Sequence, residues 1–229
     1  MSLRHREKRR TALRYLLALP RSIVYNFRLF PLRQAWRLPL LLSHHTVVRD
    51  LSGHIEIQSP QLKTGLIIIG FNGCPNSDFR YHRPCICVQG NMVVKGNCAI
   101  GMGAAIEVAE DAVLTLGPMF CLGPRSTLIC HKAMTFGNHS RISWDCTLMD
   151  TDQHALTDSP GTRTNPDREV VFGDNVWLGH HVIVTKGTHL ASHITAAAGA
   201  RLVGSYDQPL SILAGNPATI VKQGVKRSD

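Results

Sequence analysis

The chain has 229 residues and a formal net charge of +9 at pH 7. Residues 1–40 contain ten Lys or Arg and one acid, Glu7, whereas residues 41–229 contain fifteen basic and fifteen acidic residues. This uneven distribution argues against a uniformly basic, nucleic-acid-binding fold. At 44% hydrophobic and only 6% aromatic residues, the chain can bury a core made mainly of small and branched aliphatic side chains.

Residues 1–52 are predicted to form a basic amphipathic helical leader. Arg6, Arg10 and Arg14 recur at helical spacing, and Pro20 is expected to end the first of two or three short helices. Three roles remain open for this leader: contact with an anionic membrane, binding of nucleic acid, or packing as a cap on the rest of the chain. We expect no nucleic-acid partner, and the first and third roles compete.

The remaining local signals favour a cytoplasmic, uncleaved chain. The apolar run at residues 15–19 lies between Arg14 and Arg21, and it is too short for a signal peptide or a membrane span. The seven Cys are scattered without a C-x-x-C pair, which is typical of reduced thiols in a cytoplasmic protein. The inner face of the membrane is the alternative location, reached through the leader.

Residues 53–85 are predicted to form lead-in strands and a loop. Ile55 and Ile57 alternate with polar residues, and residues 66–69 form an aliphatic, largely β-branched run next to glycines. Residues 72–84 are rich in Asn, Gly, Pro, Asp and Arg, which is typical of a loop.

Residues 86–203 carry a six-residue repeat. In the clearest stretch an apolar residue returns every six positions, and a compact residue follows it four positions later. The apolar positions are Phe172, Leu178, Val184, Leu190, Ala196 and Leu202. A period of six indicates one short strand and one turn, repeated around a narrow prism. The two ends of such a solenoid need caps, which the leader and the tail of residues 204–229 can supply.

The repeat, together with residues 142–154 (ISWDCTLMDTDQH), 176–179 (VWLG) and 214–222 (AGNPATIVK), resembles the hexapeptide-repeat acyltransferases. Within them it looks like the branch that acylates sugars in capsule, exopolysaccharide or O-antigen synthesis. The resemblance implies a left-handed parallel β-helix, an all-β body that is usually a homotrimer with active sites between subunits. It also implies an O-acetyltransferase that uses acetyl-CoA and a carbohydrate acceptor.

The active-site loop is expected at residues 149–170, where the repeat gives way to a polar stretch. Acyl transfer to a hydroxyl needs a base, and imidazole suits this role near neutral pH. His154 matches the catalytic histidine of the family. Asp150 and Asp152 are candidates for orienting His154 or for binding the sugar.

The resemblance also marks three candidate cofactor-binding residues. Ala198 matches the middle of a Gly-Ala-Gly turn that lies against acetyl-CoA, although Ala197 replaces the first glycine. Lys222 matches a basic residue that contacts CoA phosphates. Trp177 lies in the VWLG element and is expected to line the path of the acceptor or of the pantetheine arm.

Three alternatives are kept beside this hypothesis. The first is an N-acyltransferase that acts on an amino sugar or another amine. The second is a trimeric zinc protein similar to the β-helical carbonic anhydrases, although no histidine pair in the repeat has their spacing of five residues. We therefore expect no metal. The third is a β-helix without catalytic activity.

Overall fold

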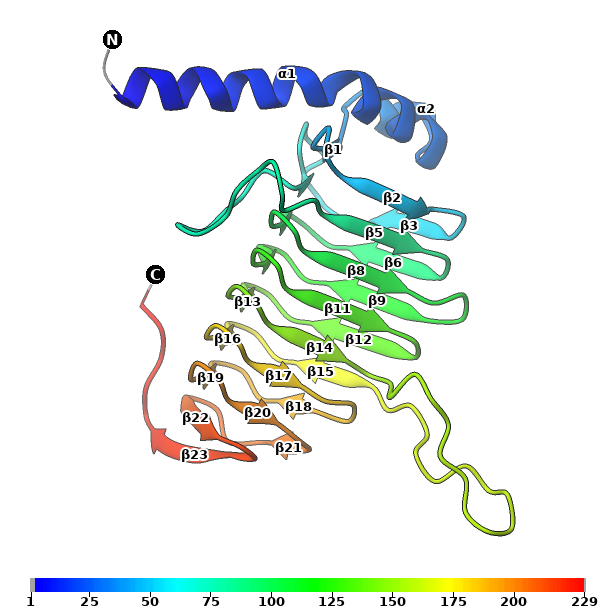
Figure 1. Ribbon diagram of the computed structural model, residues 1–229, viewed down its shortest axis with the longest axis vertical. Coiled ribbons are helices and arrows are strands. Elements are labelled where there is room, and N and C mark those ends of the chain that lie inside the picture. The colour runs from blue at the N-terminus through cyan, green and yellow to red at the C-terminus, as the bar shows by residue number, and fades with distance from the viewer. Residues whose placement is uncertain (1–2, 229) are drawn as a thin grey trace.

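The structure is a computed structural model that describes residues 3–228, with side chains from residue 12 onward. Three parallel sheets form the three faces of a tall prism, and helices lie across its N-terminal end (Figure 1). From blue to red in Figure 1, the coils wind in a left-handed sense. The left-handed parallel β-helix that the resemblance implies is therefore confirmed.

The strands follow one another around the prism in the order of sheets A, B and C. Sheet A contains β1 (Leu40–Leu42), β4 (Ile67–Ile69), β7 (Cys98–Ile100), β10 (Phe120–Leu122), β13 (Arg141–Ile142), β16 (Trp177–Leu178), β19 (Thr195–Ala196), β22 (Ser211–Gly215) and β23 (Ala218–Gln223). Sheet B contains β2 (Val47–Asp50), β5 (Cys85–Val88), β8 (Ala105–Val108), β11 (Thr127–Cys130), β14 (Thr147–Met149), β17 (Ile183–Val184) and β20 (Arg201–Leu202). Sheet C contains β3 (His54–Ile57), β6 (Asn91–Val94), β9 (Val113–Leu116), β12 (Ala133–Phe136), β15 (Val170–Phe172), β18 (His189–Leu190) and β21 (Ser205–Tyr206).

The six-residue repeat places one side chain of each strand in the interior. All six apolar positions of the clearest stretch, from Phe172 to Leu202, are at most 4% exposed. Because the strands pair in register, equivalent residues of successive coils stack on one another, as Leu128 and Leu148 do in sheet B. In sheet C the ring of Phe136 lies 4.9 Å from that of Phe172. The interior is thus one continuous apolar column.

The corners between sheets repeat a left-handed backbone conformation. At the corner between sheets A and B, Arg125, Asp145 and His181 each have a φ of 58°. Two residues earlier, Gly123 lies so close to the next coil that a Cβ atom would come within 2.2 Å of the Ser143 carbonyl oxygen. Close stacking of the backbone therefore requires glycine at that corner position.

The leader differs from the prediction of two or three short helices. Helix α1 (Leu3–Leu29) continues through Pro20, and α2 (Leu32–Ala35) follows it. Pro20 has no N–H to bond the carbonyl of Leu16, but both residues are exposed, so water can solvate that carbonyl. The prediction that Pro20 ends the helix is wrong. No helix among the described residues has both the length and the apolar character needed to cross a membrane.

The coils also extend beyond both predicted boundaries. Strands β1 and β2 lie within the stretch assigned to the leader and form the first coil. Strands β21 and β22 lie within the predicted tail but still pair in parallel with β18 and β19. Only β23 departs from the coil, because it folds back antiparallel on β22. Residues 40–52 lack a clear six-residue pattern, so the sequence predicts the N-terminal boundary of the coils too late in the chain.

Candidate active site

The chain leaves the coil after Met149 at the end of β14 and returns at Val170 at the start of β15. The intervening loop of residues 150–169 projects from the corner between sheets B and C, as the long green arm in Figure 1. Its residues from 152 to 164 are all exposed. The segment contains too many charged and polar side chains to lie in the apolar column, so it is excluded from the interior.

Asp150 anchors the start of this loop. Its carboxylate is fully buried and accepts hydrogen bonds from the backbone N–H groups of His131 (2.7 Å) and Lys132 (2.9 Å) in the preceding coil. Those bonds satisfy a buried charge that would otherwise be costly. Both carboxylate oxygens are therefore engaged in holding the corner.

Asp152 is held by the coil below the loop. Its Oδ2 atom accepts hydrogen bonds from Lys186 Nζ (2.5 Å) and from Asn165 Nδ2 (2.9 Å). The Lys186 bond, and then the Asn165 bond, lower the pKa of the Asp152 carboxyl. Lys186 also donates to the carbonyl of Asn165 at 2.9 Å. The two arms of the loop are thus tied to each other and to the corner after β17.

Asn165 fixes the backbone around His154. It is 8% exposed, and its Nδ2 donates to the His154 carbonyl oxygen at 2.9 Å. Its Oδ1 accepts the N–H of Leu156 at 2.6 Å. The His154 side chain itself is exposed. Among the described residues, no hydrogen bond or ion pair joins its imidazole to Asp150 or Asp152, so the carboxylates act on the loop rather than on the ring.

The predicted cofactor-binding residues lie elsewhere on the prism. Trp177 is paired with Thr195, Thr195 with Ile212, and Ile212 with Lys222, which places them in one row across sheet A. Trp177 is 39% exposed and donates its indole N–H to Ser143 Oγ at 3.2 Å. Ala198 is exposed at the corner between sheets A and B. These residues share one side of the molecule.

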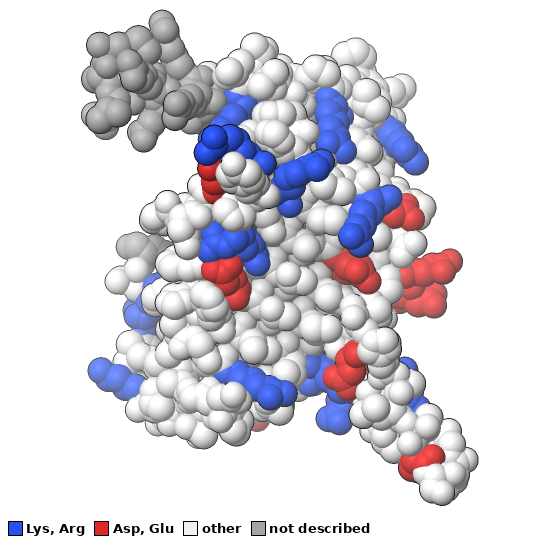
Figure 2. All heavy atoms as spheres, in the orientation of Figure 1, with Lys and Arg blue, Asp and Glu red and all other residues white. Residues whose placement is uncertain are grey.

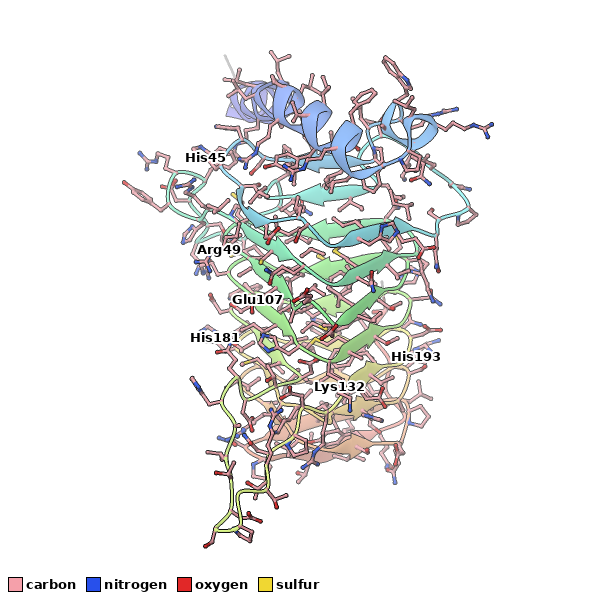
Figure 3. All side chains as sticks on the ribbon, turned by 90° about the vertical axis from the view of Figure 1, so that its right-hand side faces the viewer. His45, Arg49, Glu107, Lys132, His181 and His193 are labelled. Atoms are coloured by element: carbon pink, nitrogen blue, oxygen red, sulfur yellow. The ribbon has the colours of Figure 1, made fainter. Side chains whose placement is uncertain are left out.

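One chain does not bring its two sets of candidates together. Figure 3 faces the corner between sheets B and C, from which the loop descends, with Lys132 labelled near its base. His181 of the A–B corner and His193 of the C–A corner lie on opposite sides of that view, and sheet A lies behind. His154 therefore stands on a different side from Trp177 and Lys222.

No protein-family model matches the chain. It is 24% identical over 199 residues to an uncharacterized 24.8 kDa protein in the cps region of Klebsiella pneumoniae, covering 87% of this chain and 86% of the relative. It is 27% identical over 157 residues to polysialic acid O-acetyltransferase of Neisseria meningitidis, covering 63% and 71%. It is 36% identical over 119 residues to the putative lipopolysaccharide biosynthesis O-acetyl transferase WbbJ of Escherichia coli strain K12, covering 52% and 54%.

The chain resembles the sugar O-acetyltransferases of capsule and lipopolysaccharide synthesis. The resemblance stated from the sequence motifs is thus confirmed, and with it the prediction of an acetyltransferase enzyme. The loop around His154 and the row on sheet A are the two places where this enzyme has candidate site residues.

The sequence did not single out Asn165 or Arg125. Asn165 precedes Pro166 in the polar loop, and nothing in the neighbouring sequence predicts the three hydrogen bonds of its side chain. At the A–B corner, Arg125 forms two hydrogen bonds with Asp145, of 2.8 and 2.6 Å, and lowers the pKa of that carboxyl. His180 stacks on Trp144 at 5.2 Å. Only the coil register brings these residues together.

Metal ligands are not grouped in the part of the chain that the structure describes. No set of three or more His, Cys, Asp or Glu residues there has the arrangement needed to hold a metal ion. The adjacent imidazoles of His180 and His181 instead contact each other through their Nδ1 atoms at 2.9 Å.

Proposed function

We propose that the chain transfers an acetyl group from acetyl-CoA to a sugar hydroxyl of a surface polysaccharide or its precursor. The relatives from Neisseria and Escherichia support the reaction class and the kind of acceptor. The single structural observation that carries the proposal is the exposed His154 on a loop whose backbone is clamped by Asn165 and Lys186. A clamped backbone limits the positions that the imidazole can take, which favours a reactive geometry.

The proposed mechanism is direct attack by the acceptor. The sugar oxygen forms a bond with the thioester carbonyl carbon while the imidazole of His154 removes the hydroxyl proton. The carbon–sulfur bond then breaks, and the proton passes from the imidazolium to the departing CoA thiolate. No covalent acyl-enzyme is required, because the base makes the hydroxyl itself a sufficient nucleophile.

We further propose that the active enzyme is a homotrimer whose site is completed by a second copy. His154 lies on one side of the prism, and the row of Trp177 and Lys222 lies on another. Apposing the loop of one copy to sheet A of the next would unite the base with the residues assigned to acetyl-CoA. In this arrangement Lys222 meets CoA phosphate as a point charge, and Trp177 and Ala198 line the pantetheine path.

We propose a cytoplasmic location with peripheral contact at the inner face of the membrane. The donor acetyl-CoA and lipid-linked sugar precursors are both available there. In this arrangement the helices contact the membrane, and the coils position acetyl-CoA. The loop of residues 150–169 supplies His154 as the base.

Release of CoA thiol in the presence of candidate glycans tests the reaction. His154→Ala should lower kcat by about 10²- to 10⁴-fold, the usual contribution of a general base. His54→Ala, which removes another exposed histidine, is the matched control and should retain full turnover. Equal turnover of the His154 variant and the wild type would contradict the assignment of the base. Acetylation of amine acceptors alone would identify an N-acetyltransferase instead.

Mixed assemblies test the shared site. His154→Ala and Trp177→Ala subunits, each inactive or nearly so alone, are unfolded together and refolded. Recovery of activity in the mixture is expected, because some sites would then combine an intact loop with an intact sheet A. No recovery, with mixed trimers verified by mass, would contradict a site between subunits.

A further inference from the structure

The orientation of helix α1 is fixed by its inner face. Ala18, Ser22 and Asn26 are fully buried against the first coil. Ser22 Oγ accepts the N–H of Leu42 at 3.0 Å. The amide of Asn26 bonds both the N–H and the carbonyl oxygen of Leu40, at 3.1 and 2.7 Å. Because these bonds satisfy the top strand of the prism, the helix cannot roll without losing them.

The opposite face of α1 carries an apolar stripe that nothing in the described chain covers. With 3.6 residues per turn, positions 13, 17, 20, 24 and 27 project away from the buried positions 18, 22 and 26. The outer stripe consists of exposed large apolar residues on α1 and beside it: Leu13 54%, Leu16 63%, Leu17 48%, Val24 64%, Phe27 36%, Leu32 66% and Trp36 74%. Phe27 and Trp36 contact each other edge to face, with ring centroids 5.0 Å apart.

Positive charge lines the same end. Arg14, Arg21 and Arg28 recur every seven residues along one flank of the outer stripe, and Arg33 and Arg37 follow beside Trp36. Arg21 donates to the Thr46 carbonyl oxygen at 2.5 Å, whereas Arg28, Arg33 and Arg37 are exposed. Glu7 is the only acid in residues 1–40. Figure 2 shows Lys and Arg side chains gathered over the upper coils beneath α1. An apolar surface with a basic border is the pattern of a helix that lies in a membrane interface.

A hollow beneath the stripe continues this pattern. It has a volume of about 660 Å³ and lies between α1 and the loop at residues 77–80, with Leu13 and Leu17 at its edge. Arg14, His44 and Arg80 line it, and the Arg14 guanidinium sits 4.2 Å over the ring of Phe79. Asp78 also lines the hollow but is paired with Arg80 at 2.7 Å. Because that pair neutralises both groups, Arg14 is the remaining Arg or Lys cation of the hollow.

We propose that the N-terminal end of the prism docks on an anionic phospholipid surface, with the outer stripe in the interface and the exposed Arg28, Arg33 and Arg37 on the headgroups. Charge complementarity favours a bilayer over a second copy, because pairing this face with itself would oppose two strongly positive surfaces. Trp36 suits the boundary, since its ring is apolar and its N–H polar. The docking deepens the proposed location without depending on the proposed reaction, whereas the limit on the acceptor that follows from it rests on the proposed role of His154.

Docking in this way places a limit on the acceptor. Strand β14, from which the loop of residues 150–169 leaves, is four strands below β2 in sheet B, or about 19 Å at about 4.8 Å per strand. The loop points further away from α1 (Figure 1). An acceptor anchored in the same membrane must therefore extend at least about 20 Å from it to reach His154. The geometry selects distal sugars of a lipid-linked glycan over the sugar next to the lipid.

Sedimentation with vesicles tests the docking. The full chain should bind phosphatidylcholine vesicles containing phosphatidylglycerol, bind pure phosphatidylcholine vesicles weakly, and lose affinity as salt is raised. The triple variant Leu13→Gln, Leu17→Gln, Val24→Gln should lower the partition constant by about tenfold or more, because it removes three apolar side chains from the interface. None of the three residues packs in the core, so the fold should persist.

A matched triple variant removes exposed apolar residues of the coils instead: Val113→Gln, Met119→Gln and Val203→Gln. It should bind vesicles as the wild type does. Arg28→Glu with Arg33→Glu should abolish the preference for anionic vesicles. Equal vesicle binding by the stripe variant and the wild type would overturn the proposal. A smaller assembly of the stripe variant in light scattering, with vesicle binding unchanged, would show that a second copy covers the face.

The test separates this inference from the proposed function. Vesicle binding is measured without substrate, and His154→Ala should bind as the wild type does. Loss of docking in the stripe variant with normal turnover of a soluble acceptor supports the inference alone. Normal docking without acetyl transfer to any acceptor would remove the proposed function and leave the membrane surface in place.

Discussion

Inside the coils, each strand contributes an apolar side chain that stacks on its equivalent in the next coil, whereas the loop of residues 150–169 is held by polar contacts at single positions. Phe136 lies between Phe120 and Phe172, with ring centroids 5.0 and 4.9 Å away. In the loop, Asn165 alone joins three backbone or side-chain groups. The interior is stabilised by many similar packing contacts, so no single one determines its structure. The loop depends on a few polar contacts, each of which occurs once.

This difference separates stability from activity within one chain. A change in the interior should lower the free energy of unfolding of the whole prism and leave the loop geometry of the folded fraction intact. A change in the loop should alter the loop geometry and leave the free energy of unfolding of the prism nearly unchanged. Four substitutions test this separation, from the largest expected effect on the free energy of unfolding to the smallest.

Phe136→Ala should have the largest effect. Phe136 is 1% exposed, and its removal leaves a cavity in the column, at a cost of about 3–5 kcal/mol. Chemical denaturation measures the change. Val113→Ala, also in sheet C but 39% exposed, should cost far less. If both variants lost the same stability, the stacking of the interior would not be what stabilises the prism.

Asn26→Ala should come next. The substitution leaves the N–H and carbonyl of Leu40 without their partner, and one unsatisfied buried group costs about 1–3 kcal/mol. Hydrogen exchange should quicken at the Leu40 amide and in β1 before it quickens in β14. Uniform exchange throughout the prism would mean that α1 and the first coil unfold only with the rest.

The Arg125–Asp145 pair should contribute less than about 1 kcal/mol, because both side chains are partly exposed. The pKa of Asp145 is lowered in the folded chain by Arg125, so its contribution is present above the unfolded pKa and is lost as the pH falls through the folded value. Asp145→Asn should therefore flatten the loss of stability below about pH 4. Asp111→Asn, at an exposed turn, serves as the control.

Asn165→Ala should change the free energy of unfolding least and the activity most among these four variants. Loss of the clamp frees the His154 backbone, and a displacement of about 1 Å can lower turnover about 10²-fold. Exchange at the Leu156 amide should quicken, while the denaturation midpoint stays close to that of the wild type. Thr162→Ala at the tip of the loop should alter neither turnover nor the Leu156 amide. Normal turnover in the Asn165 variant would show that the clamp does not position the base.

The fold was predictable because the interior repeats. Every sixth residue from Phe172 to Leu202 is apolar and buried, so the six-residue period can still be recognised when one of these residues is small, as Ala196 is. The handedness came from the resemblance, since the period of six fits either hand. The first coil was not predicted because residues 40–52 lack a clear six-residue pattern.

The candidate site was less predictable because its contacts are single and long-range. Asp150 and Asp152 looked equivalent in the sequence, yet one is fully buried under the backbone of residues 131–132 and the other is bound to Lys186. The difference between the two carboxylates depends on which residues of the neighbouring coils lie next to each of them, and the local sequence does not contain that information. Pro20 shows the same limit, because its effect depended on whether water could reach the carbonyl it left unpaired.

Strand β23 has a consequence for how the molecule behaves in concentrated solution. Parallel sheets stacked along one axis present open backbone groups at the last strand, and another copy could add there as a further coil. By turning back on β22 in the antiparallel direction, residues 218–223 occupy those groups in sheet A with the chain's own backbone. In sheet A, β22 is thereby closed to a parallel strand from another copy, and at the other end β1 is bonded by Ser22 and Asn26 of α1. Both contacts disfavour end-to-end stacking of copies through this sheet.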